Sequence, residues 1–298
     1  MSRVRIGTRG SLLARWQADH VQERLTALGH DVEQEIITTT GDRLLDRRLE
    51  AVGGKGAFLK EIEEAMQAGE EDLAVHSLKD VPTVLPDGLE LVAYLERANP
   101  RDAWLSSGPG LADLPAGATV GTTSLRRIAQ VLAARPDLEV KDLRGHVDTR
   151  LRKLREGTFD AILLAMAGLV RLGRADEVTE PLDVRTFVPA PGQGTIALEC
   201  RSDDRAVRDA VAPLNHRATA RAVRAERSFL GTLGGGCNVP LGAHAVPAEG
   251  GLELTGFVAR TDGSELLRGE RIGHDPAPLG QALAEDLLGR GAGTFLEG

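Results

Sequence analysis

Short apolar runs alternate with longer segments of helical periodicity along most of this chain. The first apolar run, residues 4–6, is followed by a glycine-containing turn and then by a helical segment. We predict a strand at each apolar run and helices between them, an order typical of an α/β fold. The first helix is expected to bury an apolar side formed by Leu12, Leu13, Trp16, Val21, Leu25 and Leu28. Further strands are expected at 33–39, 73–75, 89–95, 139–143, 161–165 and 195–200.

Two strand-to-helix turns share the same residue types. Residues 7–12 read Gly-Thr-Arg-Gly-Ser-Leu, and residues 121–125 read Gly-Thr-Thr-Ser-Leu. Ser11 and Ser124 stand at expected N-cap positions, next to helix amides that bind anions. The repeat predicts two similar domains facing one polycarboxylate ligand, although these residue types are common in such turns and the similarity is short. Charged donors for the carboxylates stand on the same turns, namely Arg9, Arg126 and Arg127.

Two proline-containing segments, 97–102 and 188–194, look like crossovers between domains. The strand after the second crossover is expected to return to the first domain. The C-terminal part alternates strand and turn, with a hairpin signal at Asp262-Gly263, and ends in an amphipathic helix over about 277–288. We predict two similar α/β lobes and a small α+β domain: domain 1 over 1–96 and 194–215, domain 2 over 97–193, and domain 3 over 216–298.

Composition narrows the function classes. The chain of 298 residues has a net charge of −8, which argues against a general nucleic-acid binder. Residues 121–155 nevertheless carry nine basic and four acidic side chains, a basic island that suits a small polyanion. No apolar run reaches membrane-spanning length and no apolar targeting segment begins the chain, so we expect a cytoplasmic protein with no membrane partner. Two cysteines without a CxxC or histidine cluster predict neither a disulfide framework nor a metal site.

A charged pair follows the strand expected at 73–75. Residues 76–82 read His-Ser-Leu-Lys-Asp-Val-Pro, which places Lys79 and Asp80 at the carboxyl end of that strand. Ligands of open α/β sheets bind at this end. A surface Lys–Asp pair of little consequence is the alternative. The position favours Asp80 over the other carboxylates as a catalytic group, and His76 is assigned no catalytic role.

Glycines surround two further polar side chains. Cys237 follows three consecutive glycines, so its thiol is placed for access, or else it is a small apolar side chain on a turn. Lys55 stands between Gly54 and Gly56, on a segment that is either a lid or a flexible connector. Cys200 lies in an apolar strand and is expected to be structural.

With these motifs in order, the chain resembles the porphobilinogen deaminase family, also called hydroxymethylbilane synthases. No single motif is specific, but their number and order along nearly the whole chain are. The resemblance rests on Thr8-Arg9-x-Ser11 with Trp16-Gln17, Gly53-Gly54-Lys55-Gly56, residues 76–82, residues 121–127, Arg144-Gly145, Gly192-Gln193-Gly194 and Gly235-Gly236-Cys237-x-Val239-Pro240.

The resemblance implies a fold and a reaction. The family has two lobes like those of periplasmic binding proteins and a small third domain. Its enzymes are transferases of haem biosynthesis that join four porphobilinogen molecules into the linear tetrapyrrole hydroxymethylbilane and release ammonia. They are generally monomeric.

The resemblance also implies roles for particular residues. Cys237 would hold a dipyrromethane cofactor through a thioether, and Asp80 would be the catalytic carboxylate. The residues expected to bind cofactor or substrate are Arg9, Ser11, Gln17, Lys55, Lys79, Thr122, Thr123, Ser124, Arg126, Arg127, Arg144, Arg150 and Gln193.

Three positions depart from the family pattern. His146 stands where asparagine is usual, Asp148 adds a negative charge among the arginines, and Thr195 replaces a smaller residue. The rival interpretation is a non-catalytic two-lobed protein that binds a small polycarboxylate, which needs neither Asp80 nor Cys237. A nucleic-acid-binding protein is the weaker rival because aromatic residues, which stack on bases, make up only 3% of the chain.

Overall fold

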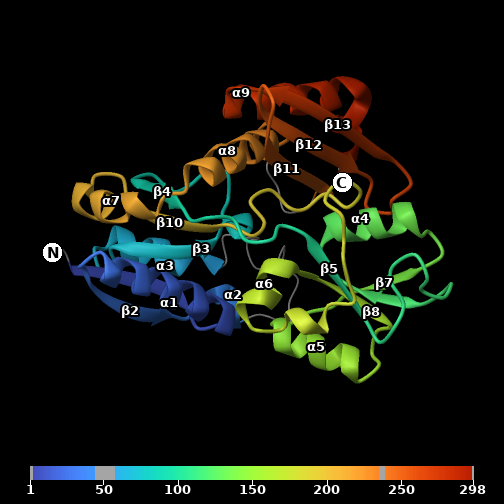
Figure 1. Ribbon diagram of the computed structural model, residues 1–298, viewed down its shortest axis with the longest axis horizontal. Helices are drawn as coiled ribbons and strands as arrows, with labels where there is room; N and C mark the ends of the chain where they lie inside the picture. The colour runs from blue at the N-terminus through green and yellow to red at the C-terminus, as the bar shows by residue number, and fades with distance from the viewer. Residues whose placement is uncertain (1–2, 44–57, 235–238, 297–298) are drawn as a thin grey trace. The chain divides into compact units, whose positions relative to one another are not determined.

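The computed structural model describes residues 3–43, 58–234 and 239–296. The chain divides into two compact units, coloured along the sequence in Figure 1. The first unit, called lobe 1 below, comprises Met1–Ala98 and Gly194–Ala220. The second comprises Asn99–Gln193, called lobe 2, and Arg221–Gly298, called the C-terminal part.

Lobe 1 is built on a five-stranded sheet of order β2-β1-β3-β10-β4. Strand β1 pairs in parallel with β2 and β3, whereas β10 is antiparallel to both β3 and β4. Buried side chains of α1 and α7 pack on one face of the sheet, and those of α3 pack on the other. The strands are β1 (Arg3–Arg9), β2 (Asp31–Ile37), β3 (Leu73–Ser77), β4 (Leu89–Tyr94) and β10 (Ile196–Arg201). The helices are α1 (Leu12–Ala27), α2 (Thr40–Arg43), α3 (Lys60–Gln67) and α7 (Arg205–Val211).

Lobe 2 repeats this architecture. Its sheet has the order β7-β6-β8-β5-β9, with β6 parallel to β7 and β8 and with β5 antiparallel to β8 and β9. Each lobe therefore contains one antiparallel strand, β10 or β5, that follows a crossover. The strands are β5 (Asp102–Ser106), β6 (Thr119–Gly121), β7 (Glu139–Lys141), β8 (Ala161–Ala165) and β9 (Glu180–Pro181). The helices are α4 (Leu125–Ala134), α5 (Val147–Arg155) and α6 (Met166–Arg171).

The C-terminal part contains a three-stranded antiparallel sheet of order β11-β12-β13. Phe229 and Leu283, from the two main helices, cover one face of this sheet, where Gly256 leaves room for their side chains. Figure 1 shows α9 lying across the strands. The elements are α8 (Arg217–Thr232), β11 (Leu241–Ala248), β12 (Gly251–Ala259), β13 (Leu266–Gly273), α9 (Pro276–Leu287) and the short α10 (Gly293–Leu296).

The predicted fold class is confirmed: two similar α/β lobes are followed by a smaller sheet with helices. Two details of the prediction were wrong. The buried side of α1 consists of Gln17, Ala18, Val21 and Leu25, whereas Leu12, Trp16 and Leu28 are exposed. Strands β5 and β9 were not predicted because their runs are short and lie beside the proline-containing crossover and Pro181. Cys200 is structural as expected: it is fully buried, and burial raises its pKa to about 12.

Candidate active site

The turn after β1 fixes Arg9 by two contacts. Its Nε donates a hydrogen bond to Asp42 Oδ2 at 3.1 Å, and its guanidinium carbon lies 4.1 Å from the centre of the Phe58 ring. Although burial opposes ionisation of Asp42, the hydrogen bonds and charge of Arg9 hold the pKa of that carboxyl below its usual value. Arg9 is therefore held in place, and its hydrogen bonds to Asp42 do not use its Nη1 group.

Ser11 and Gln17 are both engaged in the structure of α1. Ser11 Oγ accepts a hydrogen bond from the Ala14 amide at 3.2 Å, so this serine is the N-cap predicted from the sequence. Gln17 is only 2% exposed, and its Nε2 donates to Ser77 Oγ at 2.8 Å. This hydrogen bond ties α1 to the last residue of β3, directly before the turn that carries Asp80.

Lys79 and Asp80 lie on the single 3₁₀ turn Leu78–Asp80 at the carboxyl end of β3. The turn is fixed at its start, where the Leu78 amide donates to the Thr195 carbonyl at 3.0 Å. It is closed by a second bond of 3.0 Å from the Val81 amide to the Leu78 carbonyl. Both side chains are half-buried. Within the described residues no group donates a hydrogen bond to the Asp80 carboxylate, so it can accept N–H donors from a ligand.

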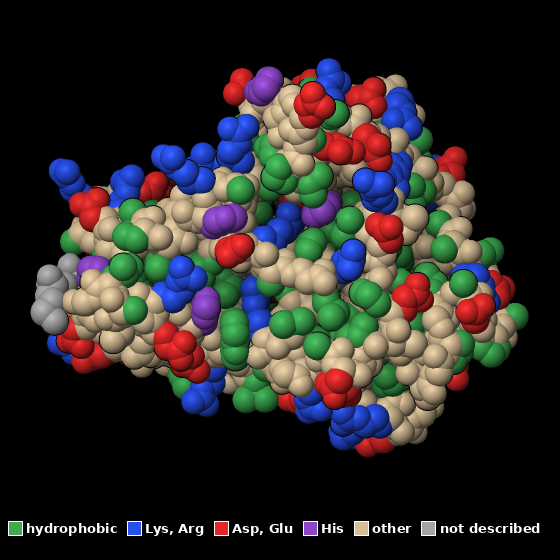
Figure 2. Space-filling model, in the orientation of Figure 1, with side chains coloured by type: hydrophobic (Ala, Val, Ile, Leu, Met, Phe, Trp, Pro, Cys, Tyr) green, Lys and Arg blue, Asp and Glu red, His purple; other side chains and the backbone are tan. Residues whose placement is uncertain are grey.

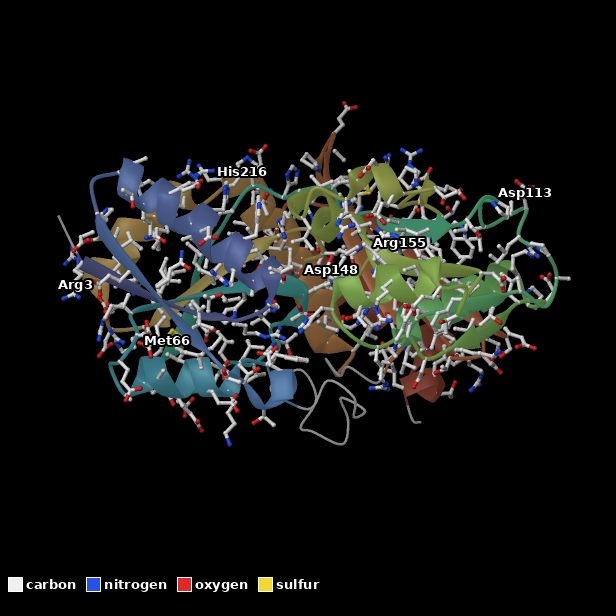
Figure 3. All side chains as sticks on the ribbon, turned by 90° about the horizontal axis from the view of Figure 1, so that it is seen from below. Arg3, Met66, Asp113, Asp148, Arg155 and His216 are labelled. Atoms are coloured by element: carbon white, nitrogen blue, oxygen red, sulfur yellow. The ribbon has the colours of Figure 1, made fainter. Side chains whose placement is uncertain are left out.

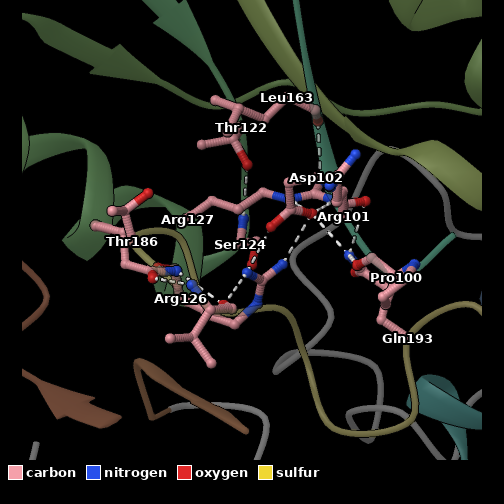
Figure 4. Close-up of polar contacts among 12 residues, drawn as sticks. Pro100, Arg101, Asp102, Thr122, Ser124, Arg126, Arg127, Leu163, Thr186 and Gln193 are labelled. Carbon is pink, nitrogen blue, oxygen red and sulfur yellow. Dashed lines mark hydrogen bonds and ion pairs between the residues drawn. The ribbon is translucent and has the colours of Figure 1, made fainter. Parts of the chain in front are cut away.

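In lobe 2, Arg126 and Arg127 converge on one buried carboxylate (Figure 4). Arg126 binds both oxygens of Asp102, with Nη1–Oδ2 at 2.6 Å and Nη2–Oδ1 at 3.1 Å. Arg127 binds Oδ1 through Nη2 at 2.7 Å and through Nε at 3.0 Å. Gln193 Nε2 donates to the same oxygen at 3.0 Å. Both arginines are 6% exposed and Asp102 is fully buried.

This cluster has an excess of positive charge. Burial opposes ionisation of Asp102, but the charges of Arg126 and Arg127 outweigh it and lower the pKa of that carboxyl far below its usual value. Burial lowers the pKa of Arg127. A guanidinium has five N–H donors, and the hydrogen bonds of the pair to Asp102, to the Val188 carbonyl and to the Leu163 carbonyl leave some of them for another acceptor. An anion would restore charge balance here.

The hydroxyl groups after β6 are arranged differently from those after β1. Thr122 is 2% exposed, and its Oγ1 accepts a hydrogen bond from the Ser124 amide at 3.2 Å. Ser124 is the N-cap residue of α4, but its side chain does not accept from the helix amides, in contrast to Ser11. Thr123 is half-buried beside it. The start of α4 therefore combines uncapped amides with the arginine pair, as an anion site requires.

Arg144 and Arg150 flank the turn between β7 and α5. Arg144 Nη2 donates to Asp142 Oδ2 at 3.1 Å, and Arg150 Nε donates to the Gly145 carbonyl at 2.7 Å. Asp148 in the first turn of α5 is paired with Arg174 at 3.0 Å, which offsets the negative charge that departs from the family pattern. Figure 3 labels Asp148 at this end of α5 and Arg155 at the other. His146 is exposed.

Family models and curated relatives match nearly the entire chain. The model described as "Porphobilinogen deaminase, dipyromethane cofactor binding domain" matches residues 4–209, and "Porphobilinogen deaminase, C-terminal domain" matches residues 220–289. The chain belongs to the porphobilinogen deaminase family. The porphobilinogen deaminase of Syntrophobacter fumaroxidans is 52% identical over 99% of this chain and 97% of its own. That of Thiobacillus denitrificans is 52% identical over 100% of this chain and 99% of its own.

Membership of the porphobilinogen deaminase family supports the enzyme and not the rival binding protein. The chain is a hydroxymethylbilane synthase of tetrapyrrole biosynthesis with a dipyrromethane-binding domain.

Among solved structures, a periplasmic substrate-binding protein of an ABC transporter from Coxiella burnetii aligns with a TM-score of 0.46 and 14% identity, covering 73% of this chain and 94% of that one. The methionine binding protein MetQ aligns with a TM-score of 0.46 and 15% identity, covering 73% and 92%.

The predicted residues fall into two groups within the porphobilinogen deaminase fold. Lobe 1 brings together Gln17, Lys79 and Asp80 around the end of β3, and lobe 2 brings together Arg126, Arg127 and Gln193 around Asp102. Cys237 and Lys55 lie outside the described residues.

The described helices include none long and apolar enough to cross a membrane. Nor do three or more described His, Cys, Asp or Glu side chains gather in a group that could hold a metal ion.

Sequence reasoning missed Asp102 as a site residue. It is the first residue of β5, a strand that was interpreted as part of a crossover. The available signal was its position before the apolar run Ala103-Trp104-Leu105, because a carboxylate that begins a buried strand needs a buried cationic partner.

Proposed function

We propose that the two lobes divide the family's reaction between them. Lobe 1 supplies the catalytic carboxylate, Asp80, and lobe 2 supplies the arginines that hold the carboxylates of cofactor and substrate. The proposal is carried by the contrast between Asp80, whose carboxylate is unpaired among the described residues, and the positively charged arginine cluster. Asp80 is fixed on a turn and has no partner among the described residues, whereas Arg126 and Arg127 form a buried cluster with excess positive charge.

The described residues fit a dipyrromethane. Each of its pyrroles has an N–H donor, an acetate and a propionate. Arg126 and Arg127 match the carboxylates, since guanidinium groups bind carboxylates with two parallel hydrogen bonds. The uncapped start of α4 adds amide donors beside them. Asp80 matches the N–H groups as an acceptor. Cys237 would carry the group through a thioether.

The reaction needs a cation to be stabilised and a growing polyanion to be held. When bound, the dipyrromethane supplies the pyrrole carbon to which the first substrate is joined. Asp80 accepts hydrogen bonds from substrate pyrrole N–H groups, and its negative charge stabilises the electron-poor substrate that remains when ammonia leaves. It is also placed to hold the proton released in each addition. Further arginines are needed because every addition brings two more carboxylates.

The remaining binding residues follow from these roles. In lobe 1, Lys79 lies next to the catalytic carboxylate, and Arg9 retains donors beyond those used by Asp42. In lobe 2, Arg144 and Arg150 border the β7–α5 turn. The full proposed set is Arg9, Ser11, Gln17, Lys55, Lys79, Thr122, Thr123, Ser124, Arg126, Arg127, Arg144, Arg150 and Gln193.

We also propose three domains with boundaries at 1–96 with 194–215, 97–193 and 216–298. The three sheets support this division, since each lies within one of these ranges. We propose a cytoplasmic monomer that acts on a small molecule and not on nucleic acid. The net charge of −8 supports the last point, and Figure 2 shows Asp and Glu side chains on the same face as Lys and Arg side chains.

The test of the catalytic role is steady-state kinetics of Asp80→Asn and Asp80→Ala. Both variants are expected to lose turnover by about 100-fold or more, because removal of one electrostatic stabiliser of a transition state has effects of that size. Asp80→Ala is also expected to bind the cofactor poorly. Asp87→Asn, on the exposed loop before β4, is the control and should behave as wild type. Rates like the wild type in both Asp80 variants would remove Asp80 from the mechanism.

A further inference from the structure

The repeated strand order allows the two lobes to be superimposed residue by residue in sequence. Gly7 of β1 pairs with Ala74 of β3, and Gly121 of β6 pairs with Ile162 of β8. Counting along β3 and β8 from these pairs makes His76 equivalent to Leu164.

The antiparallel strands extend the correspondence. Ser77 pairs with Ile196, and Ala165 pairs with Asp102. Counting along β10 and β5 from these pairs makes Glu199 equivalent to Leu105. In lobe 2 the equivalent side chains, Leu105 and Leu164, are buried in one apolar cluster with Leu151 of α5. The same place in lobe 1 holds a histidine and a glutamate.

His76 and Glu199 form a buried pair across β3 and β10. His76 Nε2 lies 2.9 Å from Glu199 Oε2, and the side chains are 5% and 0% exposed. Glu199 Oε1 is buried and has no hydrogen-bond partner among the described residues. Glu63 of α3, which is 8% exposed, lies close enough that burial and then the charge of Glu199 raise its pKa to about 7.

The groups around this pair come from each neighbouring element. Glu63 faces it from α3 and is itself influenced by Glu64 of the same helix. Tyr94 of β4 pairs with Ala197, which pairs with His76 on its other side, so Tyr94 stands in the same cross-strand row. The turn that carries Lys79 and Asp80 begins two residues after His76.

The fold does not require a polar pair here. Lobe 2 has two leucines at the equivalent places, and replacing both partners of a buried hydrogen bond by apolar side chains can be nearly neutral or stabilising. A polar pair at this place therefore contributes something other than fold stability. Its position indicates what this is, because Thr195, the residue directly before β10, fixes the catalytic turn by accepting a hydrogen bond from the Leu78 amide.

We propose that His76 and Glu199 are positioning residues for Asp80. Their bond holds β10 against the end of β3 and so fixes the turn on which Asp80 reacts, and Glu63 tunes that bond through its own charge. The inference rests on the proposed catalytic role of Asp80. Neither His76 nor Glu199 is assigned any contact with substrate.

The decisive variant copies lobe 2 into lobe 1: the double substitution His76→Leu with Glu199→Leu. We expect it to unfold at the wild-type temperature or above and to keep the wild-type KM for porphobilinogen. Its kcat should fall by about 10- to 100-fold, since a small misplacement of a reacting group has effects of this size. A wild-type kcat in this folded variant would overturn the proposal, as would a loss explained by the unfolded fraction alone.

Glu199→Gln keeps the proposal testable if the double variant does not fold. Its amide oxygen can still accept a hydrogen bond from the imidazole, so its kcat at the optimal pH should lie within about threefold of the wild-type value. The pH profile of its kcat should also shift to lower pH, because the charge of Glu199, which helps to raise the pKa of Glu63, is removed. An unchanged pH profile would contradict the positioning role.

Glu71→Gln is the matched control. Glu71 is also a buried acid of lobe 1 with a pKa raised to about 7, but it lies against Gly7 of β1 and not on the β3–β10 pair. It should leave kcat and its pH profile unchanged, and an equal effect would overturn the proposal. Asp80→Asn separates the catalytic role of Asp80 from the positioning role of His76 and Glu199. If that variant stays active, the catalytic role is wrong, whatever the result for the His76 and Glu199 variants.

Discussion

The two lobes share one strand order but bury charge on opposite faces of their sheets. In lobe 2 the charged cluster lies on the α4 face, where Asp102 binds two arginines. The equivalent of Asp102 in lobe 1 is Ile196, which is buried in an apolar cluster with residues of α1. In lobe 1 the charged cluster lies on the α3 face, where His76 meets Glu199.

This difference separates what the fold needs from what the reaction needs. Each charged cluster occupies a place that the other lobe fills with apolar side chains, so neither cluster is a requirement of the architecture. In the proposed function the arginines of lobe 2 bind anions, and the turn that carries Asp80 begins two residues after His76 of the lobe 1 cluster. Under the proposed function, a duplicated architecture provides one lobe for holding a polyanion and another for stabilising a cation.

The largest expected effect comes from breaking the lobe 2 cluster. Asp102→Ala leaves two buried guanidinium groups without their shared carboxylate. The free energy of unfolding should fall by about 3–5 kcal/mol, the usual cost of removing one partner from a buried ion pair. Chemical denaturation measures this loss, with the surface carboxylate variant Asp113→Ala as control. A loss below about 1 kcal/mol would show that the cluster does not stabilise lobe 2.

Arg127→Leu should lower the free energy of unfolding less than Asp102→Ala does. Its main effect should be on the rates of cofactor assembly and substrate addition. Arg126 still binds both oxygens of Asp102 in this variant, so the carboxylate stays paired. Assembly of the cofactor or the first substrate additions should slow by about 10-fold or more. Single-turnover kinetics beside thermal unfolding separate the two effects. Normal kinetics with a lower unfolding temperature would make Arg127 structural.

The pH dependence of stability should arise from lobe 1. Burial raises the pKa values of Glu63 and Glu71 to about 7 from 4.5, so the folded state keeps protons that the unfolded chain has already released. The folded state is therefore expected to lose stability as pH rises from about 4.5 to about 7 and then to level off. Glu63→Gln and Glu71→Gln should raise the unfolding temperature more at about pH 8 than at about pH 5. Equal shifts at both pH values would contradict this origin.

The smallest effect is expected at the Arg9–Asp42 pair. The pKa of Asp42 is lowered in the folded state, so its contribution to stability is present above the unfolded value of 3.8 and is lost as pH falls further. Asp42→Asn should cost about 1 kcal/mol or less at neutral pH, as expected for a pair near the surface. Thermal unfolding at neutral pH and at about pH 3 should show the difference shrinking in acid.

Local patterns allowed part of this structure to be predicted. Ser11 was recognised as an N-cap because a cap depends on neighbouring residues only, and the hairpin at Gly263 follows from a positive φ of 72° that glycine tolerates. Long-range contacts were out of reach. Asp102 is bound by residues at least 24 positions away, and Glu199 reaches His76 across 123 positions. Periodicity also misplaced the buried side of α1, since Trp16 stacks on His20 at the surface instead of entering the core.

The most direct test of the account is the intact mass of the denatured protein. Two additional pyrrole units are expected on the wild type and also on Cys200→Ala, because the wild-type Cys200 thiol is buried and its pKa is raised to about 12. Cys237→Ala should have its unmodified mass, because it lacks the thiol that is proposed to carry the dipyrromethane. An unmodified wild type after incubation with porphobilinogen, or a modified Cys237→Ala, would contradict the account.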